Sequence, residues 1–344
     1  MTDKGHQAVS PWQMPRAAWK DIASRTWQRT WDDNVGLVAA GVAFYGFFAL
    51  VSIIGIVVLA YGMVAEPRTV VKHMGVLTDV LPPDIALLIA EQALNAVTTS
   101  EATKGTGLLV ALAAALYGGT NGSAALITAL NIAYEEKEKR SLARFYLLAL
   151  LMTLAAVLVT LTALAGTAFV AAIGADQGAV PLLGKIGGYL LLLLASAILI
   201  SGLYRYVPSR EEARWVWITP GSIFAAAVWL LLTVLFGFYV SNLTNFSATY
   251  GSLGALAALQ TWLYLSAYVL VMGAELNSEI EHQTARDSTI GPEGPIGKRG
   301  AWAADNVATS DEVEDRPEET REGEKLTQAS ATVSDRDSLT DTAP

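Results

Sequence analysis

The feature that most constrains this chain is a set of long stretches without charged side chains. Residues 35–61 and 147–173 contain no Asp, Glu, Lys, Arg or His. Each stretch exceeds the ~20 residues with which a helix crosses ~30 Å of hydrocarbon. In hydrocarbon the backbone must satisfy its own hydrogen bonds, so such stretches form helices. The sequence therefore predicts an all-α, polytopic integral membrane protein.

Four further apolar stretches follow the same pattern. Together they predict six transmembrane helices, at residues 35–61, 106–134, 145–173, 180–203, 215–240 and 250–276. Short extramembrane helices are expected at 70–81, before Pro82 and Pro83, and at about 84–98.

The lysines and arginines of the connecting segments predict the orientation, because they are retained on the cytoplasmic side. On one side lie Lys4, Arg16, Lys20, Arg25, Arg29, Lys137, Lys139, Arg140, Arg144, Arg205, Arg210 and Arg214. The other side has only Arg68, Lys72, Lys104 and Lys185. Both termini are therefore expected in the cytoplasm.

Composition divides the chain into three parts. Residues 1–33 form a cytoplasmic segment in which tryptophans and bases at helical spacing, from Pro11 to Trp31, predict an interfacial helix. Residues 34–284 form the six-helix transmembrane domain. Residues 285–344 hold 14 acidic and 7 basic side chains and few large apolar ones, so a disordered acidic cytoplasmic tail is expected. Cysteine is absent, which excludes disulfides and thiol chemistry.

Four segments resemble the YihY/BrkB family of bacterial membrane proteins, historically also labelled ribonuclease BN. They are DNVGLVAAGVAFYGFFA at 33–49, LYGGTNGSAALITALNIAY at 116–134, LYRYVPSREEARWVWITPG at 203–221 and YGSLGALAALQTWLYLSAYVLVMGAELNSEIE at 250–281. The resemblance covers residues 31–281 and implies a six-helix protein of the bacterial inner membrane. Transport or export roles have been suggested for the family, but its biochemical activity is not established. The resemblance therefore indicates where the protein is located more specifically than what it does.

The ribonuclease label is disfavoured by the residues themselves. Metal-assisted RNA cleavage needs clustered histidine and carboxylate ligands. The three histidines are His6, His73 and His282, and the expected topology separates His73 from the other two. No basic groove for a nucleic acid, no catalytic motif and no cofactor or metal motif is recognised. We therefore expect neither an enzyme nor a nucleic-acid-binding protein.

Polar residues inside an apolar span are costly and so mark candidate sites. The second span carries Gly118, Asn121, Gly122 and Ser123 near its middle and Asn131 toward the cytoplasm. One interpretation is a broken helix whose freed carbonyls line a solute pathway. The other is close helix packing, with Gly118 and Gly122 as a small-xxx-small pair.

The sixth span begins with Gly251 and Gly254, whose spacing favours tight contact with a partner helix. At the cytoplasmic ends of the fourth and sixth spans, Arg205 and Glu275 are predicted to form an ion pair, the alternative being two separately hydrated charges. No intramembrane Asp, and no Glu away from a helix end, marks an evident proton or sodium site.

The leading hypothesis from the sequence is a transporter or exporter of a lipid-linked or amphipathic envelope component. The expected partners are the lipid bilayer and a lipid-type or small-molecule substrate, and a homo-oligomer is left open. The alternative is a non-transporting membrane scaffold or regulator of envelope assembly.

Overall fold

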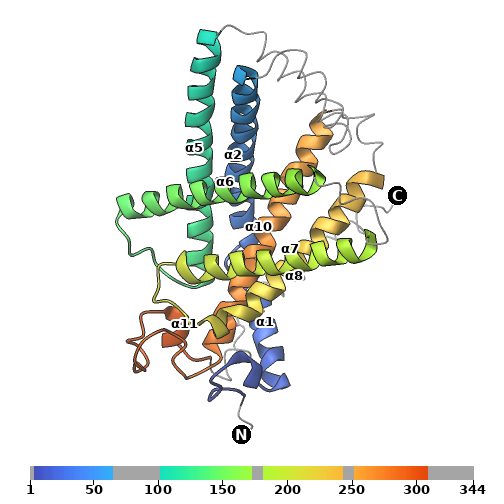
Figure 1. The fold of residues 1–344 in the computed structure, drawn as a ribbon. Coiled ribbons are helices and arrows are strands. Elements are labelled where there is room, and N and C mark those ends of the chain that lie inside the picture. The colour runs from blue at the N-terminus through green and yellow to red at the C-terminus, as the bar shows by residue number, and fades with distance from the viewer. Residues whose placement is uncertain (1–3, 65–100, 173–180, 243–251, 309–344) are drawn as a thin grey trace, which may run out of the picture.

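The computed structural model describes residues 4–64, 101–172, 181–242 and 252–308, which form helices joined by turns (Figure 1). These residues contain no strand beyond an isolated bridge between Ala213 and Thr289. The helices are η1 (Pro11–Gln13), α1 (Arg16–Asp32), α2 (Val35–Val64), α5 (Glu101–Ala133), α6 (Leu142–Ala172), α7 (Pro181–Tyr206), α8 (Trp215–Asn242), α10 (Ser252–His282) and α11 (Trp302–Asp305). The short helices expected at 70–81 and 84–98, and residues 309–344, lie outside the described residues.

Each of the six expected spans coincides with a long helix, namely α2, α5, α6, α7, α8 or α10. Among the described residues, Trp215–Tyr239 and Leu256–His282 are long and apolar enough to cross a membrane. The bent pair of Arg16–Asp32 and Val35–Leu50 would be a third such span. The helical character of the six segments is thus confirmed, whereas the crossing of the membrane by all six stays a prediction.

Hydroxyl groups within these apolar helices are satisfied by their own backbone. Thr128 donates to the carbonyl of Ala124 over 2.9 Å, and Thr233 donates to that of Trp229 over 2.8 Å. This bond to the preceding turn satisfies both hydroxyl donors within their own helices. These two threonines therefore need no partner helix for their hydroxyl donors.

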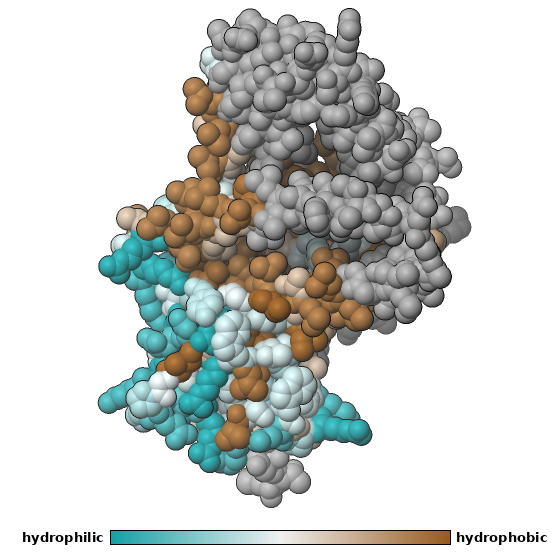
Figure 2. Space-filling view, viewed as in Figure 1, coloured by the Kyte–Doolittle hydropathy of each residue, from teal (hydrophilic) through white to brown (hydrophobic). Residues whose placement is uncertain are grey.

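The molecule has a polar end and an apolar part. Figure 2 shows hydrophilic residues gathered at the end that carries α1 and α11, and hydrophobic residues over the helices beyond it. The apolar part keeps large side chains on its surface, among them Tyr117, Leu191 and Phe44, which are 71%, 69% and 52% exposed. Such surfaces are stable in contact with lipid and not with water.

Helix α1 packs on the polar end of α10. Its Ile22 is fully buried in a small core with Met14, Trp217 and Ile280. Its Trp27 and Trp31 face outward, with 58% and 65% of their surface exposed. An interfacial role for this helix stays a prediction, to which the exposed tryptophans are suited.

The chain bends by 62° between α1 and α2. The bend lies at Asp33 and Asn34, where Asn34 adopts a left-handed conformation with φ of 50°. Asparagine tolerates this conformation better than most residues. The amide N–H of Leu37 then donates to the carbonyl of Asn34 over 2.8 Å, which begins α2.

The expectation of disorder from residue 285 onward is wrong for residues 285–308. This segment folds back over the polar end, and the amide N–H of Ala285 donates to the carbonyl of His6 over 2.8 Å. The amide N–H of Ala308 donates to the carbonyl of His282, also over 2.8 Å. The scarcity of large apolar residues predicted disorder, but the segment packs through small buried alanines (Ala301, Ala303 and Ala304) instead.

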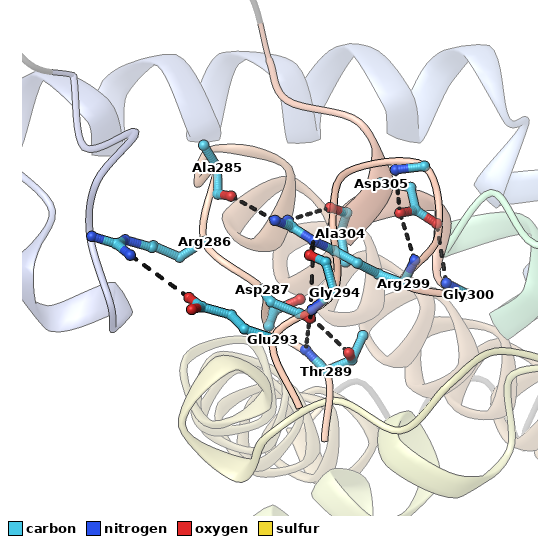
Figure 3. A network of polar contacts seen from close by, with 12 residues as sticks. Ala285, Arg286, Asp287, Thr289, Glu293, Gly294, Arg299, Gly300, Ala304 and Asp305 are labelled. Carbon is cyan, nitrogen blue, oxygen red and sulfur yellow. Dashed lines mark hydrogen bonds and ion pairs between the residues drawn. The ribbon is translucent and has the colours of Figure 1, made fainter. Parts of the chain in front are cut away.

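Two buried polar side chains, Asp287 and Arg299, organise this segment (Figure 3). Asp287 accepts hydrogen bonds from the N–H and hydroxyl of Thr289 and from the N–H of Gly294. Arg299 donates to the carbonyls of Gly294, Ala304 and Ala285 over 2.8 to 3.0 Å. Side-chain bonds to backbone thus replace secondary structure here.

Candidate functional site

The glycine-rich part of the second span is an unbroken helix. Helix α5 runs from Glu101 to Ala133 without interruption, so the interpretation as a broken helix with freed carbonyls is not what the structure shows. The side-chain amide of Asn121 donates to the carbonyl of Tyr117 in its own helix over 2.7 Å. Ser123 shares a hydrogen bond of 3.0 Å with Thr153 of α6.

The glycines of this segment allow close helix packing. A Cβ on Gly118 would lie 2.9 Å from the backbone nitrogen of Ala49 in α2, closer than packed atoms approach. A Cβ on Gly122 would lie 3.5 Å from the backbone nitrogen of Gly46. Helices α2 and α5 accordingly lie side by side (Figure 1). The geometry thus favours the packing interpretation of Gly118 and Gly122.

The close approach between α8 and α10 lies away from the predicted Gly251 and Gly254. Gly251 is outside the described residues, and Gly254 lies in the first turn of α10. A Cβ on Gly221 of α8 would lie 2.3 Å from the carbonyl oxygen of Gly273 in α10. Sequence reasoning missed Gly273, although it lies in the segment 250–281 that carries the family resemblance.

Asn277 completes this contact by bonding the backbone beside Pro220. Proline lacks an N–H and disturbs the helix turn before it. The side-chain oxygen of Asn277 accepts from the N–H of Gly221 over 2.8 Å, and its amide donates to the carbonyl of Ile218 over 2.9 Å. Asn277 is fully buried. One amide side chain therefore serves both backbone groups and joins α10 to α8.

Asn131 joins two turns at the polar end. Its oxygen accepts from the N–H of Ser209 over 2.7 Å, and its amide donates to Glu138 over 2.9 Å. Burial would raise the pKa of Glu138, but hydrogen bonds from the Arg140 N–H and from Asn131 hold that pKa below its ordinary value. Asn131 therefore positions the turns between helices.

The predicted ion pair between Arg205 and Glu275 is wrong. The guanidinium of Arg205 donates to the carbonyl of Ala213 over 2.9 Å and to Glu212 over 3.1 Å. It also lies over the ring of Trp215, 4.5 Å from the centroid. Arg205, in the last turn of α7, thus finds its partners in the chain that follows α7 and not on α10.

Three glutamates at the polar end of α10, Glu275, Glu279 and Glu281, are 2%, 2% and 0% exposed. Buried charges are stable only when paired and hydrogen-bonded. Glu281 pairs with Arg210 at 2.6 Å and accepts from the hydroxyl of Ser288 over 2.7 Å. Burial would lower the pKa of Arg210, but the charge of Glu281 raises that pKa above its ordinary value.

Glu279 is the centre of a second paired group. The Nε of Arg25 donates to it over 2.5 Å, and the same guanidinium donates to Gln283 over 2.7 Å. Arg29 lies 3.5 Å from Glu279 and forms an ion pair with Glu135. Helix α1 is thus fastened to α10 by arginines.

Glu275 has no such partner. No Lys, Arg or His of the described chain forms an ion pair with it, and its Oε1 is buried without a hydrogen-bond donor. The carboxyl group that it meets is that of Asp33, at the bend between α1 and α2. Burial and the charge of Glu135 raise the pKa of Asp33, while Arg29 lowers it. Within the described residues, no group of three His, Asp or Glu side chains is arranged to hold a metal ion.

Comparisons with known proteins agree with the membrane character of these helices. The family model described as virulence factor BrkB matches residues 26–296. A ribonuclease-like protein of Bacillus subtilis, YfkH, is 35% identical over 173 residues, which is 48% of this chain and 62% of that protein.

Two proteins named UPF0761 membrane protein are also similar. That of Pseudoalteromonas translucida is 33% identical over 33% of this chain and 37% of its own length. That of Albidiferax ferrireducens is 24% identical over 77% of this chain and 65% of its own length. The matches thus span less than two thirds of each of these relatives, and no solved structure is similar to the chain.

Proposed function

Because the chain belongs to the virulence factor BrkB family of membrane proteins, we propose that it transports or exports a lipid-linked or amphipathic component of the envelope. The proposed location is the bacterial inner membrane, with both termini in the cytoplasm. The bonds between residues 283–285 and the amino-terminal segment support the same side for both ends, since Gln283 donates to the carbonyl of Lys4 over 2.9 Å.

The observation that carries the proposal is the bend of 62° between α1 and α2. Transport needs an element with two arrangements, and such hinges are a few residues at the ends of elements. Here α1 is fastened to α10 by Arg25, whereas α2 packs against α5 through Gly118 and Gly122. Helix α2 also lies along α10, so a change of the bend angle would shift the α2–α5 pair against α10.

The apolar surface of this pair suits a lipid-type substrate. Phe44 of α2 and Tyr117 of α5 are 52% and 71% exposed. An acyl chain in the bilayer meets such surfaces without first entering water. A substrate with a polar head and an apolar tail fits these faces better than a small ion does.

Reconstitution in liposomes tests the proposal. The purified protein should move fluorescent lipids or small amphipathic solutes, and Asn121→Leu should reduce this movement several-fold if the face of α5 lines the path. Thr128→Val is the matched control, because the side chain of Thr128 also donates to a carbonyl of its own helix. If neither the native protein nor Thr128→Val moved any of the lipids and solutes tested, the result would contradict transport.

The alternative is a non-transporting scaffold or regulator of envelope assembly. It is favoured by the ordered segment 285–308, which presents a fixed polar surface. A scaffold should respond to deletion of residues 70–98 or 309–344 and not to Asn121→Leu. Deletion of 309–344 leaves the ordered segment intact, so a loss of binding partners in a pull-down would identify the tail itself as the docking element.

The proposal includes no enzymatic activity. The name of the Bacillus subtilis relative describes that protein, and the match covers 48% of this chain. His282 is 3% exposed and lies 3.4 Å from Glu279. We expect purified protein to leave RNA intact with or without added divalent metal, which a gel assay would check.

A further inference from the structure

Asp33 and Glu275 meet across the junction of three helices. Asp33 stands between α1 and α2, and Glu275 lies on α10. The two carboxyl groups face each other within reach of a hydrogen bond. The Oδ2 atom of Asp33 and the Oε1 atom of Glu275 are both buried, and no described N–H group donates to either.

A hydrogen bond between two carboxyl groups requires a proton on one of them. Two carboxylates without a donor between them would place like charges in contact at low dielectric. Aspartate pairs that share one proton are a known solution to this problem. Two facing carboxyl groups without another donor are therefore expected to share one proton.

The surrounding charged side chains do not neutralise the pair in place of that proton. From α1 come Arg29 and Asp32, from the turn after α5 comes Glu135, and from α10 comes Glu279. Arg29 is the cation among them, and its guanidinium is already paired with Glu135 and lies 3.5 Å from Glu279. The neighbourhood is thus rich in negative charge.

We propose that Asp33 and Glu275 form a proton-binding site that holds the bend between α1 and α2 against α10. With the proton bound, one hydrogen bond joins the two elements. With the proton lost, two buried negative charges repel each other and the bend separates from α10. A role of this proton as the coupling ion rests on the proposed transport function, whereas the site itself does not.

Infrared spectroscopy of the purified native protein tests the site. A protonated carboxyl group absorbs at a frequency distinct from that of a carboxylate. At neutral pH the native protein should show such a band, and both Glu275→Gln and Asp33→Asn should remove or shift it. Each substitution keeps the size of the side chain, and either one suffices if the other fails to fold.

Glu281→Gln is the matched control, because Glu281 is equally buried on the same helix but is paired with Arg210. It should leave the band unchanged. A native protein without the band at neutral pH, or a band that survives both Glu275→Gln and Asp33→Asn, would overturn the proposal. So would a band that disappears when sodium replaces potassium at constant pH, since that would indicate a sodium site. Because no transport is measured, the result is independent of the liposome assay.

Discussion

Helix α10 is joined to α1 by buried charges at its polar end, whereas α2 and α5 are joined by glycines in the apolar part. The Arg25–Glu279 contact has a partner for each charge, with exposed side-chain fractions of 7% and 2%. The Gly118 contact has no polar group and depends only on the absence of a Cβ. Buried polar side chains thus need specific partners, whereas apolar helices need surfaces that fit each other closely.

The largest expected effect comes from breaking a charge pair at the polar end. Arg25→Ala leaves Glu279 buried with weaker pairing, which should lower the free energy of unfolding by about 3–5 kcal/mol. Thermal unfolding in detergent would measure this. Arg16→Ala, at an exposed position on the same helix, should change the free energy of unfolding little. Equal stability of the two variants would show that the pair does not hold α1.

The next effect comes from filling a close contact in the apolar part. Gly221→Ala places a Cβ 2.3 Å from the carbonyl oxygen of Gly273 and should destabilise by about 1–3 kcal/mol. Gly237→Ala on the same helix meets no atom within 4 Å and should be neutral or stabilising. The ratio of folded protein to aggregate after mild heating compares the two variants. Similar behaviour of both would contradict the close contact between α8 and α10.

A smaller, local effect is expected in segment 285–308. Burial would raise the pKa of Asp287, but hydrogen bonds from Gly294 and Thr289 and the charge of Arg299 hold that pKa below its ordinary value. The unfolded segment therefore binds a proton more readily than the folded one. The stabilisation is fully present above the ordinary pKa and is lost as the pH falls below about 4.

Asp287→Asn should destabilise the folded segment in the same way at neutral pH, lowering its free energy of local unfolding by about 1–2 kcal/mol. Hydrogen exchange of residues 285–308, with each rate divided by the intrinsic rate at that pH, measures it. Glu293→Gln is the control, because the side chain of Glu293 is 65% exposed and its ion pair with Arg286 is long, at 3.6 Å. Faster exchange in Glu293→Gln than in Asp287→Asn would contradict the role of Asp287.

The smallest effect is expected for Asn121→Leu, which should change the free energy of unfolding by less than about 0.5 kcal/mol. The amide of Asn121 donates to a carbonyl of its own helix, so its loss removes no bond between helices. Denaturant titration in detergent would measure the change. A loss of several kcal/mol would mean that Asn121 bonds a neighbouring helix, and would make this variant unsuitable as a test of the transport path.

The sequence predicted the helices well and their polar contacts poorly. The helices follow from local apolar runs, so α8 begins at Trp215 as expected. The partners of Glu279 and Asp33 come from distant parts of the chain, and no local pattern indicates them. Arg205 was paired with the wrong acid because equal depth in the membrane does not determine the direction of a side chain.

The most direct test concerns the position of the polar end relative to the membrane. The chain has no cysteine, so single cysteines can be placed by Thr99→Cys, Lys139→Cys and Asn245→Cys. Intact cells are then treated with a membrane-impermeant maleimide. We predict labelling of the first and third positions, and labelling of position 139 only after the cells are made permeable. Labelling of position 139 in intact cells would contradict a cytoplasmic polar end beneath transmembrane helices.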